Sequence, residues 1–530
     1  MHIINKFFYS LILMALLAGC SSSSRWSGYD NKSVTAPNQL YGTYVVDMYG
    51  QSDASRNIAV LLPTSGPHAT IGQTIRPAIE MAALQHAPRG ARINFYDTGA
   101  GNPESTISEM LSQNPDVIIG PVFADTARIL RDMKPSSIPA LAFTSDLSAV
   151  GDGVLSVSLI PTNSTEAVLQ AMKSDGVERF IIMAPDNTSG HIMAGAAKSV
   201  NSAYDIKNIG VFYYNEHDAN SIKDITNTAS MYTARSAANT RAREILANIV
   251  NNETLSAAER SSVISQLSKT NKRDVIGKLP YDAILFLGTA DDTKSLVSFL
   301  RYYGVGANDV RMYGTSMWEG TDIASDVTMT GAKFATMAEI PQNLSTTYES
   351  AAGKPASRMA AIGYDATILA VNAAYADGGA MSYLVNPSGY IGANGLFRLL
   401  PNGTNERALQ ILRINGDGTT TPVKDASVNF INQMYVNTSN YIVPAESMPL
   451  ESDGINPMNY INIPDRLRGK YKSKKYGANS VQHVEKVESL NNTSIVVQPA
   501  EDFSITAENY QPIQLENVSR KNIDAIEITE

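Results

Sequence analysis

The sequence predicts an α/β protein built on a doubly wound parallel sheet. Short apolar runs without polar alternation recur between residues 58 and 186, as expected of strands that are buried on both faces. Helical stretches separate these runs, and strands that alternate with helices form parallel sheets. Each run also ends in a small loop that carries hydroxyls or Gly and Pro. Ligands of open α/β sheets bind at such carboxyl ends of the strands.

Four strands carry this pattern. The first covers residues 58–62 and is followed by the loop 63–66 and by a helix from about residue 71 to 84. The other three strands cover residues 117–119, 140–143 and 180–183 and lead into Gly120-Pro121, Thr144-Ser145 and Pro185-Asp186. These loops are therefore the predicted functional edge of the sheet.

The first nineteen residues have the pattern of a secretory signal peptide. Lys6 precedes the apolar stretch 7–17, which is too short to span a bilayer. The stretch runs into Leu-Ala-Gly-Cys, which resembles a bacterial lipobox in which Cys20 becomes lipidated after cleavage. Cys20 is the only cysteine of the chain, and the alternatives are an uncleaved anchor or a chance cysteine. Ser21, in place of Asp, favours the outer membrane in Gram-negative lipoproteins.

Two segments have the composition of linkers. Residues 20–56 are rich in Ser, Asn, Gly and Tyr, which predicts a flexible tether after the lipidated cysteine. Residues 425–530 lose apolar periodicity and end in an acidic stretch, which predicts a low-complexity tail that is disordered or is ordered by a partner. Its basic run, 466–475, is either a solvated linker or a contact with anionic lipid, a glycan-linked polymer or an acidic partner.

Composition limits the possible functions. The segment 57–424 is long enough for two domains with full cores. The formal net charge of −9 argues against general nucleic-acid binding. With a single cysteine the chain has no disulfide framework, so its stability must come from packing.

No catalytic or cofactor motif is present in the sequence. It lacks HExxH, CxxC, a Walker-type GxxxxGK and GxSxG, and its histidines are scattered. The glycine-spaced loop 389–395 neither follows a clean strand nor opens a helix, so it does not indicate a dinucleotide site. Ser65 and His68 are the nearest approach to a catalytic dyad, but a turn or helix-cap serine beside a polar rim residue explains them better. We therefore expect no enzyme, no cofactor and no metal.

Residues 58–66, 94–99 and 116–122 (IAVLLPTSG, NFYDTG and DVIIGPV) resemble the amino-terminal lobe of type I periplasmic binding proteins of the leucine/isoleucine/valine-binding kind. Seven later segments point to one family that shares this fold. These segments are 281–289, 300–304, 312–318, 362–366, 392–398, 402–403 and 407–411. Their order is similar to that in the penicillin-binding protein activator family, outer-membrane lipoproteins that stimulate peptidoglycan synthases. Longer activators carry a helical-repeat domain where this chain has its tether, and the tail has no counterpart.

The resemblance implies a two-lobed type I periplasmic binding protein fold, each lobe a doubly wound parallel sheet, with three interlobe crossings near residues 159–162, 337–341 and 397–401. It assigns 57–158 and 342–398 to lobe one, and 159–340 and 402–424 to lobe two. Within lobe two, residues 219–278 form a long helical insertion. This insertion is either a set of ordinary surface helices or a surface for docking a partner.

The resemblance also implies a cleft between the lobes. In the amino-acid binders, hydroxyls and backbone amides hold the ligand carboxylate, and a carboxylate holds the ammonium. The corresponding residues are Thr64, Ser65, Phe123, Ala124, Asp125, Thr144 and Ser145 in lobe one, and Asp186, Ala290, Asp291, Ser316 and Trp318 in lobe two. The loss of hydroxyls at Phe123 and Asp125 weakens the amino-acid interpretation. Asp125 either caps the following helix or repels an anion, and Trp318 either stacks on a ligand or closes the core.

The leading hypothesis is a non-catalytic lipoprotein on the periplasmic face of the outer membrane that regulates peptidoglycan synthesis by binding a penicillin-binding protein. It would act through differential affinity for an active conformation of the synthase. The alternative is the solute-binding lipoprotein of an ABC importer for branched or polar amino acids. A third hypothesis is hydrolysis by a serine in the cleft. An intact fold with a degenerate cleft is expected of a protein that recognises a partner.

Overall fold

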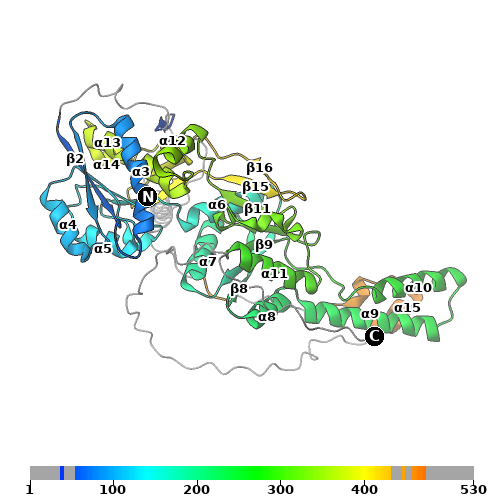
Figure 1. Cartoon of the computed structure of the whole chain (residues 1–530). Coiled ribbons are helices and arrows are strands. Elements are labelled where there is room, and N and C mark those ends of the chain that lie inside the picture. Colours follow the sequence, from blue (N-terminus) through cyan, green and yellow to red (C-terminus); the bar gives the residue numbers. More distant parts are fainter. Residues whose placement is uncertain (1–35, 41–53, 431–444, 448–454, 473–530) are drawn as a thin grey trace, which may run out of the picture.

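Two α/β lobes, a small third sheet and a projecting helical arm form the computed structural model of the chain (Figure 1). The structure describes residues 36–40, 54–430, 445–447 and 455–472. The predicted fold class is confirmed, because parallel strands alternate with helices in both lobes. The chain passes between the lobes three times: between Ser156 and Pro161, between Thr336 and Gln342, and between Arg407 and Gln410. The third crossing therefore follows the predicted residues 397–401, which belong to a strand and turn of the small sheet.

Lobe one contains a five-stranded sheet, in the order β3-β2-β4-β5-β6, in which every pairing is parallel. Its strands are β2 (Arg56–Leu62), β3 (Ala91–Asp97), β4 (Val117–Ile119), β5 (Ala140–Ala142) and β6 (Val154–Ser156); its helices are α3 (Ala69–His86), α4 (Pro103–Ser112), α5 (Ala124–Met133), η2 (Leu147–Ala149), α12 (Gln342–Ala352), α13 (Arg358–Tyr375) and α14 (Ala380–Leu384). Ile58, Val60 and Leu62 of β2 enter the core beneath α3 and α13. Ala59 and Leu61 enter the opposite core beneath α4 and α5. The unbroken apolar run is thus explained by two buried faces.

Lobe two contains a seven-stranded sheet in the order β16-β15-β11-β10-β9-β7-β8. Its strands are β7 (Arg179–Pro185), β8 (Lys207–Tyr214), β9 (Ala283–Phe286), β10 (Arg311–Gly314), β11 (Lys333–Thr336), β15 (Gln410–Ile414) and β16 (Thr420–Lys424); its helices are α6 (Pro161–Ser174), α7 (Thr188–Asn201), α8 (Ala219–Ala229), α11 (Ala290–Tyr302), η3 (Ser316–Trp318), η4 (Asp322–Ser325) and η5 (Val327–Met329). Strands β7 to β11 are parallel, whereas β15 and β16 form an antiparallel edge. A short turn joins those last two strands, and only antiparallel strands can be joined that way.

The third sheet contains β1 (Asn38–Gln39), β12 (Tyr390–Gly392), β13 (Gly395–Leu399) and β14 (Asn405–Arg407). Its edge strand β1 comes from the predicted tether and pairs parallel with β12. The prediction of a flexible tether is therefore wrong for residues 38–40, and Leu40 is 2% exposed in the core of lobe one. The physical reason is that the edge of β12 offers unpaired backbone groups that a passing segment can satisfy.

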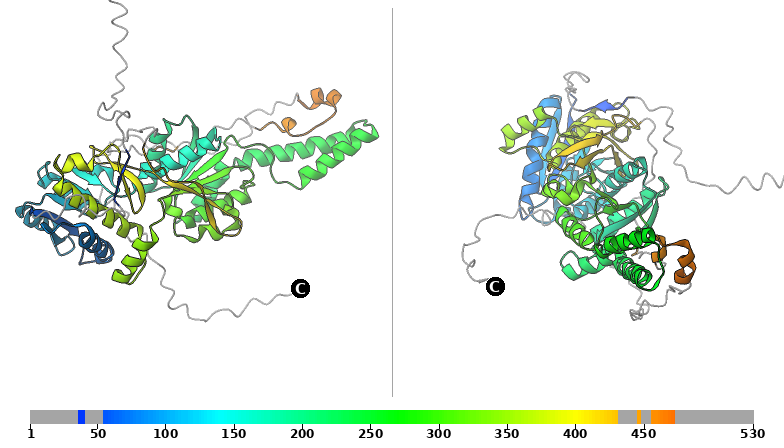
Figure 2. Two further views of the ribbon diagram at one scale, coloured as in Figure 1. Left: turned by 90° about the horizontal axis from the view of Figure 1, so that it is seen from above. Right: turned by 90° about the vertical axis from the view of Figure 1, so that its right-hand side faces the viewer.

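A helical hairpin projects from lobe two and forms the arm (Figures 1 and 2). It consists of α9 (Tyr232–Asn252) and α10 (Ala257–Asn271), which lie within the predicted helical insertion. Residues 455–472 pack against this hairpin and contain η6 (Pro457–Asn459) and α15 (Asp465–Lys472). We call residues 455–472 the strap.

The strap corrects the prediction of an unstructured tail. Met458, Ile463 and Leu467 are buried against α9 and α10, although their irregular spacing follows neither a helical nor a strand period. Two residues of the basic run also form ion pairs with the arm. Arg466 pairs with Glu259 at 3.1 Å, and Lys470 pairs with Glu253. The solvated-linker interpretation therefore does not hold for these two residues.

Candidate functional site

The first predicted cleft loop, which follows β2, already holds a carboxylate of the chain itself. Asp97 ends the neighbouring strand β3, and its Oδ1 accepts backbone N–H groups from Thr64 at 2.8 Å, Ser65 at 3.2 Å and Gly99 at 2.9 Å. Burial by itself would raise the pKa of Asp97, but hydrogen bonds from Ser65, Gly99 and Thr64 lower it to about 2. The donors predicted to bind a ligand anion thus bind Asp97.

Ser65 and His68 do not form a dyad in this loop. The Ser65 side chain hydrogen-bonds to Asp97. The ring of His68 lies against Phe123, with 4.8 Å between the ring centroids and a tilt of 59°. The two residues therefore have different partners, which gives no support to a catalytic serine.

The second predicted loop begins α5. Phe123 is the N-cap residue of this helix, and Ala124 is 1% exposed in the core. Asp125 lies in the first helical turn, where a carboxylate interacts favourably with the helix dipole, and it pairs with Arg128. Arg128 also pairs with Asp146, so one arginine neutralises two carboxylates at the rim of lobe one.

The third predicted loop follows β5 and is held by its own hydrogen bonds. The Thr144 hydroxyl accepts the N–H of Asp146 at 3.0 Å, and the Thr144 carbonyl accepts the Ser156 hydroxyl at 2.7 Å. Thr144 is 6% exposed, so its role in the structure is to fix the loop. Ser145 is partly buried beside it and is the more accessible of the two hydroxyls.

In lobe two, Asp186 follows β7 and contacts the imidazole of His191, whose Nε2 lies 2.8 Å from Asp186 Oδ1. The His191 ring stacks on Tyr213, with 3.9 Å between the centroids. The carbonyl of Ala445, in the tail, accepts the Tyr213 hydroxyl. Asp186 therefore belongs to a cluster that the tail completes.

Ala290 and Asp291 form the first turn of α11. Thr289 caps this helix, with its hydroxyl accepting the N–H of Asp292 at 3.2 Å. Ala290 is 5% exposed in the core. The Asp291 side chain is exposed, and one of its carboxylate oxygens lies 3.7 Å from the Lys294 ammonium. Of this pair, only Asp291 is accessible to a ligand.

Of the two alternatives for Trp318, the structure agrees with the one in which the residue closes the core. It is 1% exposed and lies between Phe286 and Phe334, whose ring centroids are 6.3 and 6.0 Å away. The backbone of Gly314 lies so close that a Cβ there would clash with the indole. Ser316 lies beside it with its hydroxyl 3.1 Å from that of Ser164 on α6.

The predicted residues gather on two edges. In lobe one their loops follow the adjacent strands β2, β4 and β5, and in lobe two they follow the adjacent strands β10, β9 and β7. Arg358, at the start of α13, links the lobes: its Nε donates to Glu319 at 3.0 Å, next to Trp318. The same guanidinium donates at 3.1 Å to the carbonyl of Met337, in the second crossing.

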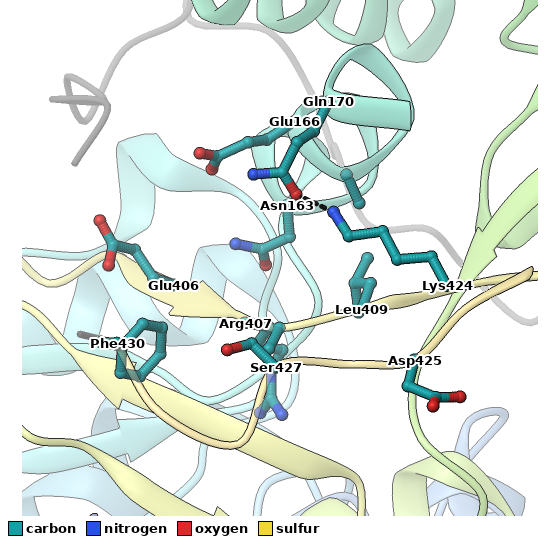
Figure 3. Close-up of a pocket in the computed structure, with 12 residues that line it drawn as sticks. Asn163, Glu166, Gln170, Glu406, Arg407, Leu409, Lys424, Asp425, Ser427 and Phe430 are labelled. Atoms are coloured by element: carbon teal, nitrogen blue, oxygen red, sulfur yellow. Dashed lines mark hydrogen bonds between the residues drawn. The ribbon is translucent and has the colours of Figure 1, made fainter. Parts of the chain in front are cut away.

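A separate pocket of about 590 Å³, solvent-side space included, lies at the third crossing (Figure 3). It is lined from α6, β14, the end of β16 and residues 425–430, and none of the twelve predicted cleft residues lines it. Its charged or aromatic side chains are Glu166, Glu406, Arg407, Lys424, Asp425 and Phe430. We call this space the hinge pocket.

The acidic side chains of the hinge pocket are held in an unfavourable environment. Burial, and then the neighbouring Glu406, raise the pKa of Glu166 to about 7. Tyr204 donates its hydroxyl to Glu166 at 3.1 Å. Burial also raises the pKa of Glu406, and Arg398 opposes this through an ion pair.

The basic side chains lie on other parts of the same wall. Burial lowers the pKa of Lys424, whose ammonium donates to the side-chain carbonyl of Gln170. Arg407 is 8% exposed and donates through Nη2 to the carbonyl of Val157. Its Nε and Nη1 are buried without a hydrogen-bond partner among the described residues.

Sequence reasoning missed the residues that dominate these sites. Asp97 could have been found, because it ends a strand next to β2 and the same edge rule applies to it. Glu166 and Glu406 could not, because 240 residues separate them and neither belongs to a motif. The link through Arg358 depends on the angle between the lobes, which no local pattern encodes.

Within the described residues, no group of three or more His, Cys, Asp or Glu side chains is placed to hold a metal ion. The same part of the chain has no helix with the length and apolar character to cross a bilayer. The predicted lipidation site, Cys20, lies outside the described residues.

Comparison with curated proteins identifies a relative of similar sequence. The penicillin-binding protein activator LpoA of Mannheimia succiniciproducens is 26% identical over 198 residues, which is 36% of this chain and 34% of that protein. The match thus spans about a third of the relative's length.

Two crystal structures share the fold. Full-length LpoA from Haemophilus influenzae is 17% identical with a TM-score of 0.50, over 71% of this chain and 60% of that one. A protein assigned to a branched-chain amino acid ABC transporter of Rhodospirillum rubrum is 14% identical with a TM-score of 0.51, over 70% of this chain and all of that one. At these identities the likeness concerns the fold alone.

The most extensive match covers both lobes and all three crossings. A family model described as periplasmic binding protein matches residues 55–419, well over half of the chain. Together with the two-lobed parallel architecture, this match shows that the chain belongs to the periplasmic binding protein family.

Proposed function

We propose that the protein is a non-catalytic lipoprotein on the periplasmic face of the outer membrane that regulates peptidoglycan synthesis by binding a penicillin-binding protein. The observation that carries this proposal is the 26% identity to a penicillin-binding protein activator over 198 residues. Lipidation at Cys20 would supply the membrane anchor.

The state of the cleft supports a partner-binding function over solute transport. Backbone donors of Thr64, Ser65 and Gly99 hold the Asp97 carboxylate. A free amino acid would have to displace that carboxylate before its own could bind there. The rim acids Asp125 and Asp146 are likewise neutralised within the chain, by Arg128.

The proposed mechanism requires no chemistry in the lobes. A synthase that interconverts between less and more active conformations shifts toward the one that the regulator binds more tightly. The arm and the strap offer a surface for such an interaction, because they project beyond lobe two (Figures 1 and 2).

The test is capture of the partner from intact cells. The full chain, affinity-tagged, is crosslinked in the envelope and purified, with an unrelated tagged lipoprotein as the control. We expect enrichment of a penicillin-binding protein over that control, and faster glycan polymerisation or crosslinking when the two purified proteins are mixed. Ser145→Ala, which alters only a cleft hydroxyl, should capture the synthase equally well. Equal recovery of synthases with the control lipoprotein would contradict the proposal.

The importer alternative makes a different prediction. A solute receptor saturated at a hundred times its dissociation constant gains about 2.7 kcal/mol of stability, which raises the melting temperature of a domain of this size by several degrees. We expect branched and polar amino acids to leave the melting temperature of the full chain unchanged. A shift that Ser145→Ala abolishes would instead support the receptor.

A further inference from the structure

The hinge pocket lies outside the cleft in which members of this fold close on their ligands. Its walls come from α6 of lobe two, from β14 of the third sheet, and from residues 424–430, which follow the last strand of lobe two (Figure 3). All these segments adjoin the third crossing. A molecule bound there would contact α6 of lobe two and β14 of the third sheet, which lie on either side of that crossing.

Two charged side chains of this pocket, Glu166 and Lys424, make their hydrogen bonds to uncharged groups. Glu166 receives only the hydroxyl of Tyr204, and Lys424 donates to the neutral side chain of Gln170. Within the described part of the chain, neither Glu166 nor Lys424 has an oppositely charged atom within 4 Å, although each influences the pKa of the other. Glu166 is partly buried without an ionic partner among these residues, which leaves a desolvation cost that a cationic group of a ligand can offset.

The acidic side of the pocket suits a cation. Glu406 disfavours the ionised form of Glu166, and an ammonium placed between the two would favour both carboxylates. The side chain of Asn163 lies below that of Glu166 in Figure 3. Phe430 adds an aromatic ring on the same side, and its face already holds the guanidinium of Arg398 at 4.3 Å.

The ammonium of Lys424, beside Gln170, offers a contact for an anion. Lys424 brings an ammonium group that burial disfavours in its charged form, so a carboxylate beside it would relieve that cost. Ala167, Ala408 and Leu409 provide apolar surface in the same pocket. Such surface fits the methylene chain of a molecule with charges at both ends.

We propose that the hinge pocket binds a small zwitterion whose ammonium lies between Glu166 and Glu406 and whose carboxylate contacts Lys424. This proposal does not rest on the synthase interaction. A purified chain with no partner should therefore bind the ligand. The charges can come from a free ω-amino acid or from the ends of a short peptide, which share this chemistry.

The experiment uses probes of graded length. Thermal melting and calorimetric titration of the full chain are carried out with β-alanine, 4-aminobutyrate, 6-aminohexanoate and diglycine. Propylammonium and propionate serve as single-charge controls. We expect one length of zwitterion to raise the melting temperature by 2 °C or more, and both single-charge probes to raise it less. If diglycine is the best probe, the peptide source is favoured; if an ω-amino acid is, the free one.

Four variants locate the site. Glu166→Gln and Lys424→Gln should each reduce the probe-induced shift by at least half. Ser145→Ala in the cleft and Glu80→Gln on the exposed face of α3 should leave it unchanged. If Glu166→Gln melts early without a probe, Lys424→Gln on the exposed strand β16 still decides the question. No shift with any zwitterion, an equal shift with propylammonium, or a shift that Ser145→Ala removes would overturn the proposal.

The pH dependence provides an independent check. Because Glu166 has a pKa of about 7, it is mostly neutral at pH 6 and mostly charged at pH 8. The groups that influence it are Glu406, Tyr204, Arg398 and Lys424. Affinity for the best zwitterion should therefore rise several-fold from pH 6 to pH 8, and Glu166→Gln should abolish that rise. A dependence on pH that persists in Glu166→Gln would contradict the assignment of the ammonium site.

Discussion

Asp97 shows how a single side chain can change the use of a fold. Three backbone donors converge on one of its oxygens, so the loop after β2 is satisfied without any solute. An intramolecular carboxylate competes with free ligands at a high effective concentration, because the fold holds it in place. The carboxylate at the end of β3 thus occupies the donors that an amino-acid ligand would need in this loop. The sheet itself is left intact.

The acid stability of the protein should report on this carboxylate. The folded-state pKa of Asp97 is about 2, below the ordinary value of about 4, so its contribution is full above pH 4 and is lost as the pH falls toward 2. We expect the unfolding free energy of the wild type to fall by roughly 1 kcal/mol more than that of Asp97→Asn between pH 4 and pH 2. Urea titrations at a series of pH values measure this difference. Parallel pH profiles for the two proteins would show that the three hydrogen bonds do not stabilise the charged form.

Trp318 illustrates what a sequence cannot say about one residue. It follows β10, at the edge where we predicted the cleft loops, but the bulk that suits stacking on a ligand equally suits a core. The indole lies in the core because Gly314 has no side chain and leaves space for it, and because Phe286 and Phe334 on neighbouring strands pack against it. These contacts arise only once β9, β10 and β11 are paired.

At the scale of elements, the strands were predictable because burial on both faces requires a continuous apolar run in the sequence. The runs at 58–62 and 117–119 correspond to β2 and β4, and the run at 180–183 lies within β7. Strand β1 and the strap contain no such apolar run. Each is short, and each is ordered by a surface far away in the sequence, namely the edge of β12 and the groove between α9 and α10.

The strap should stabilise the arm locally. Leu467 of α15 is 8% exposed and packs with apolar residues of α9 and α10, so Leu467→Ala should cost about 2 kcal/mol of local stability. We expect faster amide hydrogen exchange in α9 and α10 and unchanged exchange in β2 and β7. Ile264→Ala, at a 47% exposed position of α10, is the matched control and should change neither. Uniform loss of protection across both lobes after Leu467→Ala would contradict a local role.

At the scale of the whole molecule, Arg358 joins the two lobes. Its guanidinium donates to Glu319 of lobe two, to the carbonyls of Met337 and Ala338 in the second crossing, and to the side chain of Asn394 at 3.1 Å. These partners come from different parts of the chain. We therefore expect this side chain to help set the angle between the lobes.

Removing that side chain should release the lobes. Arg358→Met keeps the length of the side chain but deletes every donor, so we expect a larger radius of gyration in small-angle X-ray scattering and a lower melting temperature. Arg76→Met removes an arginine that makes an exposed pair with Glu80 within lobe one and serves as the control. An unchanged scattering curve for Arg358→Met would show that the crossings alone set the angle.

The pairing of β1 with β12 has a consequence for how far the body can stand from a membrane. For a lipid anchor at Cys20, the tether ends at Asn38, where the chain pairs with β12, and not at the start of lobe one. Eighteen residues separate these two points, and a fully extended chain of that length spans about 60 Å. If Cys20 is lipidated, two hydrogen-bonded residues would thus halve the length of the tether and would confine the body, and whatever it binds, to a layer close beneath the bilayer.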